Sequence, residues 1–121
     1  MTLLRDSSMS RVNVRYFALL RELLGNTREE KYNIKNGTML IDLLLKHIPE
    51  RHRKVSTKWK ERIFEMDRGE IKLDKYGTPV LSEYYMILIN GRYYNSISKM
   101  GLMYPLRNED VIAILPPVGG G

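Results

Sequence analysis

Apolar and polar residues alternate over residues 12–16, which is the pattern of a strand with one buried face. Residues 27–34 alternate more weakly and are more polar, so they predict an edge strand that pairs with the first. Residues 84–89 are apolar throughout, which favours a central strand covered on both sides. The short apolar run at residues 111–115 predicts a last, buried strand.

Helical spacing of apolar residues begins after Thr38, a suitable N-cap. The buried stripe of this main helix consists of Leu40, Leu43, Leu44 and Ile48. We expect Pro49 to end the helix, because proline disfavours helical geometry in the residue before it. A shorter helical pattern over residues 17–24 follows the first strand and stops at Gly25, a suitable C-cap.

A basic segment after the main helix predicts a second amphipathic helix. Its apolar stripe consists of Val55, Trp59, Ile63 and Met66. The cations fall mostly on the other face and are Arg51, Arg53, Lys54, Lys58, Lys60, Arg62 and Arg68. They hold much of the net charge of +6, but a solvated helix face explains them. The stacking aromatics and repeated motif of a nucleic-acid site are missing, so nucleic acid is not an expected partner.

Together these elements predict one α+β domain over residues 12–115 with the β-grasp arrangement. A mixed sheet of four to five strands would pack on one main helix, with an inserted helical segment at about residues 50–83. Parallel first and last strands would place both in the centre of the sheet. We expect residues 1–11 to form a flexible extension, with Met1 and Met9 both candidate starts, and residues 116–121 a flexible tail.

The sequence contains little chemistry of its own. It has no cysteine, which excludes disulfides, thiolate nucleophiles and cysteine-based metal sites. His47 and His52 have no carboxylate or cysteine at ligand spacing, so neither a metal nor a bound cofactor is expected. No apolar stretch is long enough to span a bilayer, and the first residues do not resemble a signal peptide. We therefore expect a cytoplasmic protein that makes no membrane contact.

The last residues, Pro116 to Gly121, are the most distinctive feature of the chain. Two prolines stiffen the base of the tail, and three glycines make backbone without bulk that can thread a narrow enzyme tunnel. A frayed end is the alternative interpretation. The carboxylate of Gly121 is inert until an ATP-using partner converts it to an acyl-adenylate. A sulfur nucleophile or an amine could then displace AMP.

Three segments resemble the small sulfur-carrier subunit of molybdopterin synthase, a family of β-grasp proteins in the ubiquitin-like superfamily. VRYFALLRELLG at residues 14–25 is similar to the family's first strand and short helix, and INGR at residues 89–92 to its hairpin. LRNEDVIAILPPVGGG at residues 106–121 resembles its closing segment, which is the most specific of the three. Residues 50–83 look longer than the corresponding region of compact members.

The resemblance implies a non-catalytic sulfur-donor subunit, so the chain by itself need not count as an enzyme. An E1-like adenylating enzyme would use ATP on Gly121, and a persulfide donor would leave a thiocarboxylate there. The large synthase subunit would supply the catalytic groups and transfer this sulfur to build the dithiolene that binds molybdenum or tungsten. The residues expected to contact partners are Gly120, Gly119, Val118, Pro117, Pro116, Leu115 and Arg21.

Other functions of the same tail remain open. The chain could be a ubiquitin-like modifier joined to lysines through Gly121, or a sulfur carrier for thiamine synthesis or transfer-RNA thiolation. The Pro-Pro-Val sequence before the glycines resembles the molybdopterin branch more closely. A plain binding module is the remaining alternative, in which trimming the glycines would leave every activity intact.

Overall fold

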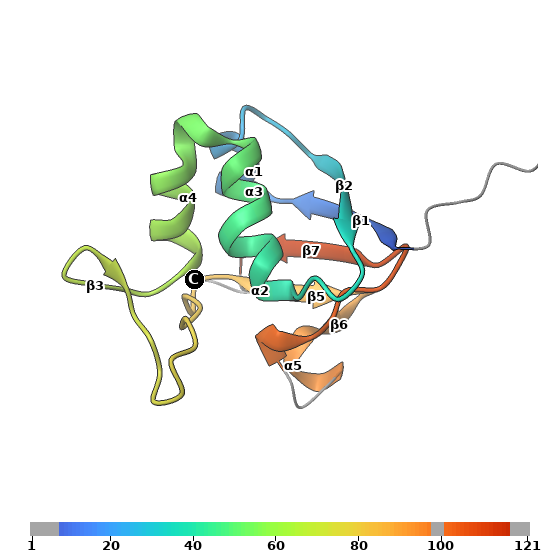
Figure 1. Ribbon diagram of the computed structural model, residues 1–121. Coiled ribbons are helices and arrows are strands. Elements are labelled where there is room, and N and C mark those ends of the chain that lie inside the picture. The colour runs from blue at the N-terminus through green and yellow to red at the C-terminus, as the bar shows by residue number, and fades with distance from the viewer. Residues whose placement is uncertain (1–7, 98–100, 117–121) are drawn as a thin grey trace, which may run out of the picture.

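The computed structural model describes residues 8–97 and 101–116, which form a mixed sheet with helices against one face (Figure 1). In spatial order the strands are β2 (Glu29–Lys35), β1 (Met9–Tyr16), β7 (Val111–Leu115), β5 (Met86–Ile89) and β6 (Arg92–Tyr93). β1 and β7 run parallel, and the other neighbours are antiparallel. The predicted α+β sheet with a central parallel pair is confirmed.

The first strand begins earlier than the alternation predicted. Met9–Tyr16 is continuous, and Met9 pairs with Lys35 at the far end of β2. The prediction of a flexible extension over residues 1–11 is therefore wrong for residues 9–11. Ser10 is buried, and its hydroxyl donates to the Asn36 side chain at 2.6 Å, so this polar stretch is held by the turn after β2.

The main helix covers residues 40–51 in three consecutive parts. These are α2 (Leu40–Asp42), a π-helical segment η1 (Leu43–His47) and α3 (Ile48–Arg51). Met39 is the N-cap in place of Thr38, and its backbone N–H donates to the Asp42 carboxylate at 2.9 Å. The helix packs on the sheet residues Val12, Val14, Tyr16, Tyr32, Ile34, Ile87, Ile89, Ile112 and Ile114.

Pro49 does not end the main helix, contrary to the prediction. The Ile48 N–H donates to the carbonyl of Leu43, five residues back, so the helix widens by one residue before the proline. In a regular α-helix the same N–H would bond to Leu44, and the next residue, Pro49, has no N–H to offer. The indole N–H of Trp59 donates to the Leu44 carbonyl at 2.8 Å. A side chain from the insertion thus replaces the missing backbone donor.

The insertion consists of a short turn η2 (Arg53–Val55), helix α4 (Ser56–Ile63) and a hairpin of β3 (Met66–Asp67) and β4 (Glu70–Ile71). In Figure 1, α4 lies beside the main helix and the hairpin extends away from the sheet. Trp59 and Ile63 are buried as predicted, and the Trp59 ring meets Tyr16 edge-on at 6.0 Å. Met66 lies in β3 and is 36% exposed, so its place on the helix stripe was wrong.

Three shorter helices complete the fold. α1 (Ala18–Leu23) follows β1, as the sequence predicted, and buries Leu20. α5 (Tyr94–Ile97) and η3 (Gly101–Met103) lie between β6 and β7.

A polar cluster joins β1, β2 and the end of the main helix around Glu30. One carboxylate oxygen of Glu30 accepts hydrogen bonds from the hydroxyls of Tyr16 at 2.9 Å and Tyr32 at 3.0 Å, and meets Nε2 of His52 at 2.8 Å. The Arg51 guanidinium lies 3.7 Å from the centre of the Tyr32 ring and 3.7 Å from the other Glu30 oxygen. Burial by itself would raise the pKa of Glu30, but the bonds from His52, Tyr16 and Tyr32 hold this pKa below its usual range.

We expect Trp59→Phe to lower the free energy of unfolding by about 1–3 kcal/mol, because it leaves the buried Leu44 carbonyl without its donor. Far-UV circular dichroism in urea measures the change, since the variant lacks the chain's one tryptophan. Pro49→Ala supplies a backbone N–H beside the same carbonyl, so Trp59→Phe should cost less in that background. An equal penalty in both backgrounds would contradict the assignment.

Acid should weaken the fold partly through Glu30. Its folded pKa is lowered, so its contribution is complete above the usual glutamate pKa and is lost as the pH falls through the folded value. Glu30→Gln should therefore reduce stability near neutral pH and flatten its decline in acid, as urea midpoints across pH would show. Glu22→Gln, at an exposed carboxylate on α1, is the control. Equal pH profiles for the two variants would refute the role of Glu30.

Candidate functional site

The tail begins at the C-terminal end of β7, a central strand of the sheet. Leu115 ends β7 and Pro116 after it is exposed, and we call these two residues the tail root. β1 ends at the same end of the sheet, with Tyr16 beside Ile114, and β5 begins there, with Met86 beside Leu115. The predicted contact residues Pro117, Val118, Gly119, Gly120 and Gly121 lie outside the described residues. The structure therefore places the base of the tail.

Arg21 belongs to α1 and contacts the last residue of β1, at the end of the sheet where the tail root lies. Its Nε donates to the backbone carbonyl of Tyr16 at 3.3 Å, and its guanidinium lies 5.7 Å from the centre of the Phe17 ring. Arg15 approaches the same ring at 5.9 Å. The turn from β1 into α1 thus gathers two cations around one half-buried aromatic ring, where an incoming carboxylate or acidic side chain would meet positive charge.

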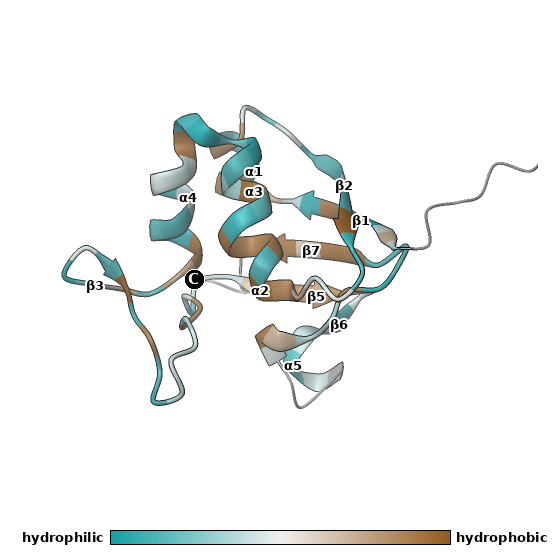
Figure 2. Cartoon of the chain, viewed as in Figure 1, coloured by the Kyte–Doolittle hydropathy of each residue, from teal (hydrophilic) through white to brown (hydrophobic). Residues whose placement is uncertain are grey.

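The sheet face opposite the main helix carries an apolar patch next to the tail root. This open face consists of the half-buried side chains of Met86, Leu88, Val111, Ala113 and Leu115. Cross-strand pairing places them together, since Met86 lies beside Leu115 and Leu88 beside Ala113. Figure 2 shows β5 and β7 as hydrophobic ribbons along their length. The prediction that the strand at residues 84–89 is covered on both sides is wrong, because the domain buries only one face.

The start of β7 is fixed by a buried carboxylate. Asp110 accepts hydrogen bonds from the Asn90 amide at 2.8 Å, the Tyr104 hydroxyl at 3.1 Å and the Arg107 backbone N–H at 2.8 Å. The Asn90 side chain in turn accepts the Val111 N–H at 2.9 Å. Asn90 and Gly91 both have positive φ, at 53° and 82°, which is the conformation of the tight turn that the sequence predicted. These contacts set the register of the strand that ends at the tail root.

The described part of the chain offers little for chemistry of its own. It holds no group of three or more His, Cys, Asp or Glu side chains placed to bind a metal ion. In the same residues, no helix has both the length and the apolar character needed to cross a membrane. The site is therefore a base for a tail and an apolar surface beside it.

Solved structures are similar to this chain in fold. The small archaeal modifier protein 1 of Methanosarcina acetivorans is 34% identical, with a TM-score of 0.66 over 93% of this chain and 98% of that one. A protein assigned as molybdopterin converting factor, subunit 1, of Pyrococcus furiosus is 29% identical, with a TM-score of 0.58 over 90% and 99%. Urm1 of Trypanosoma brucei, 16% identical with a TM-score of 0.51 over 95% and 99%, shares the fold alone. No curated protein sequence matches the chain.

The sheet order and these likenesses define a β-grasp protein of the class that includes sulfur carriers and ubiquitin-like modifiers. The profile of the ThiS family matches residues 14–121, and the chain belongs to that family. The resemblance found in the sequence segments is thereby confirmed.

Sequence reasoning named the tail root and Arg21 as expected contact residues, but of the open face it named only Leu115. The signal was present, because residues 84–89 are apolar at positions that point to both sides of a strand. One sequence cannot tell whether the second side is covered by the same chain or by a partner.

Asp110→Asn should loosen β7. An amide has one acceptor oxygen where the carboxylate offers two, so a donor of Asn90, Tyr104 or Arg107 would lose its partner, at a cost of about 1–3 kcal/mol. Hydrogen exchange should become faster at the amides of residues 111–115. Glu109→Gln, at the exposed neighbouring carboxylate, should leave exchange nearly unchanged. Unchanged protection in Asp110→Asn would disprove the anchoring role.

Proposed function

We propose that the protein is a sulfur carrier for the synthesis of molybdopterin, the organic part of the molybdenum or tungsten cofactor. The observation that carries the proposal is a sequence that continues from the central strand of a ThiS-family domain through Pro-Pro-Val to Gly-Gly-Gly. The Pyrococcus furiosus neighbour, assigned as molybdopterin converting factor, supports this branch of the family.

The chemistry would take place on the carboxylate of Gly121. This carboxylate attacks the α-phosphate of ATP in an E1-like adenylating enzyme, and pyrophosphate leaves. The terminal sulfur of a persulfide donor then attacks the acyl carbon and displaces AMP. A thiol reductant cleaves the remaining sulfur–sulfur bond and leaves a thiocarboxylate. Transfer of this sulfur to the pyranopterin precursor, with water as the second reactant, restores the carboxylate.

The folded domain would present the tail and bind the partners. Leu115 and Pro116 fix where the tail starts, and Gly119 and Gly120 give it a narrow profile. The open face is the surface that the adenylating enzyme and the large synthase subunit would cover, because an exposed apolar patch next to a functional segment is typical of an interface. The catalytic acids and bases would belong to those partners.

The test is intact mass spectrometry after co-expression with the cognate adenylating enzyme and a persulfide source. The full chain should show one oxygen exchanged for sulfur. Deletion of Gly119, Gly120 and Gly121 together should abolish the exchange, since no accessible glycine carboxylate remains. Deletion of Gly121 alone still ends in glycine, so it tests the reach of the tail. Sulfur loading that survives the triple deletion would disprove the proposal.

A ubiquitin-like modifier is the second candidate, favoured by the neighbour from Methanosarcina acetivorans, which is a small archaeal modifier protein. Trypsin would cut after Arg107 and leave residues 108–121 attached to target lysines, because that segment contains no lysine or arginine. Cellular proteins carrying this remnant would establish conjugation. Carriers for thiamine synthesis or transfer-RNA thiolation would show the same mass exchange but would not restore molybdopterin in a strain that lacks its own carrier.

A further inference from the structure

The positive charge of the protein is concentrated in one short part of the insertion. Residues 51–62 contain six lysines and arginines and one acid, Glu61, which gives +5 of the net +6 of the chain. The other residues are almost neutral as a group. Charge segregated in this way creates a local potential that an evenly mixed surface does not.

Most of these cations make no ion pair with another described residue. Arg51 faces Glu30, but Arg53, Lys54, Lys58, Lys60 and Arg62 have no such partner. Lys58 and Arg62 lie four residues apart in α4, so these like charges are neighbours on one flank of the helix, and Lys54 lies in η2 just before it. We call these three residues the basic stripe. Like charges four residues apart destabilise a helix, as do cations at its N-terminus. Glu61, three residues after Lys58, and the place of Arg62 in the last turn of α4 offset only part of this cost.

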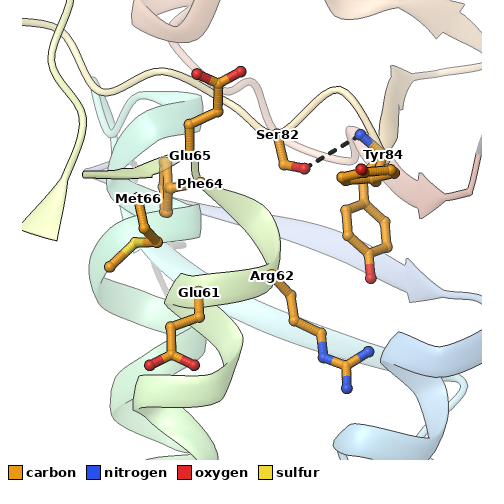
Figure 3. A pocket seen from close by; sticks show the side chains of 8 residues that line it. Glu61, Arg62, Phe64, Glu65, Met66, Ser82 and Tyr84 are labelled. Carbon is orange, nitrogen blue, oxygen red and sulfur yellow. Dashed lines mark hydrogen bonds between the residues drawn. The ribbon is translucent and has the colours of Figure 1, made fainter. Parts of the chain in front are cut away.

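The last residue of the stripe, Arg62, lies near the residues that precede β5, the strand that pairs with the tail root. Arg62 lines an open cavity of about 520 Å³ together with Tyr84 and Tyr85, and Tyr85 directly precedes Met86, the partner of Leu115. Figure 3 shows Arg62 and Glu61 leaving α4 in different directions, with Tyr84 on the Arg62 side. Glu61 and Glu65 also line the cavity, and Glu65 pairs with Lys72 at 3.6 Å. A protein that receives the tail therefore comes within reach of Arg62.

We propose that the basic stripe docks an acidic surface of the adenylating enzyme beside the mouth of its tail channel, and that its main effect is on the rate of encounter. This inference rests on the proposed function, which supplies the enzyme. An acidic protein surface fits better than nucleic acid for two reasons. Arg62 lies beside the residues that lead into β5, next to the strand that carries the tail, and Trp59, the aromatic ring of α4, is buried and cannot stack on a base. Complementary charge at the edge of an interface raises association rates more than affinity.

The experiment measures association with the cognate adenylating enzyme by stopped-flow, without ATP, over a range of salt concentrations. Lys58→Glu with Arg62→Glu should slow association by about tenfold or more at low salt. The difference should vanish at high salt, where screening shortens the reach of the charges. Lys35→Glu with Arg107→Glu makes the same charge change at two exposed side chains. Both lie at the end of the sheet opposite the tail root, so this control should have a much smaller effect.

Each outcome decides the proposal. Equal rates for the two double variants, or a loss of rate that salt does not remove, would overturn it. So would a stripe variant that binds the enzyme normally but loses affinity for polyuridylate RNA. With saturating enzyme and ATP, the stripe variant should still load sulfur to completion, since its tail is intact. A full chain that binds the enzyme but never loads sulfur would refute the proposed function and leave the docking result standing.

Discussion

The parallel pairing of β1 with β7 is the constraint on which the rest of the structure depends. The two strands come from opposite ends of the described chain, and each needs a second neighbour, which β2 and β5 provide. Alternate residues of the pair face the main helix and form the core. The remaining residues of β7 face outward beside β5 and form the open face. The direction of β7 also decides where the tail starts, so one pairing places the core, the open face and the tail root.

The insertion is attached to this core where the main helix departs from regular α-helical hydrogen bonding. Pro49 removes a helix donor, the widened segment η1 shifts the remaining bonds, and Trp59 supplies the hydrogen bond that Leu44 lacks. Nearby, the cluster around Glu30 ties the end of the helix to β1 and β2. His52 stands before α4 in the chain and Trp59 lies within it. Their hydrogen bonds to Glu30 and Leu44 therefore fix the position of α4 relative to the sheet.

The sequence predicted the strands and the main helix well, because their apolar residues recur at the spacing that places them on one buried face. Its errors have local causes. Pro49 was expected to end a helix that a side chain from another helix allows to continue, and no local pattern encodes that donor. Met66 continued the helical spacing past Ile63, where the chain had already turned toward a hairpin. Residues 9–11, Met-Ser-Arg, gave no strand signal, because the one side chain of the three that is buried is the polar Ser10. Pairing with β2 holds their backbone in the strand.

The candidate site could be predicted only where single residues or a short local sequence define it. Gly121 and its glycine neighbours can be read from composition, and Arg21 from a resemblance in the first helix. The open face and the basic stripe depend on which residues share a side of a sheet or helix, and on which charges remain unpaired after folding. Those properties belong to the three-dimensional arrangement.

The place of β7 has a consequence for how the protein is made. A ribosome adds this strand last among the elements, although it belongs at the middle of the sheet. Until it has emerged, β1 and β5 lack their shared neighbour, and the hydrophobic side of the main helix has only part of its support. Completion of the domain therefore has to wait until β7 has been made. A chain that stops before this strand has neither a complete core nor the tail root.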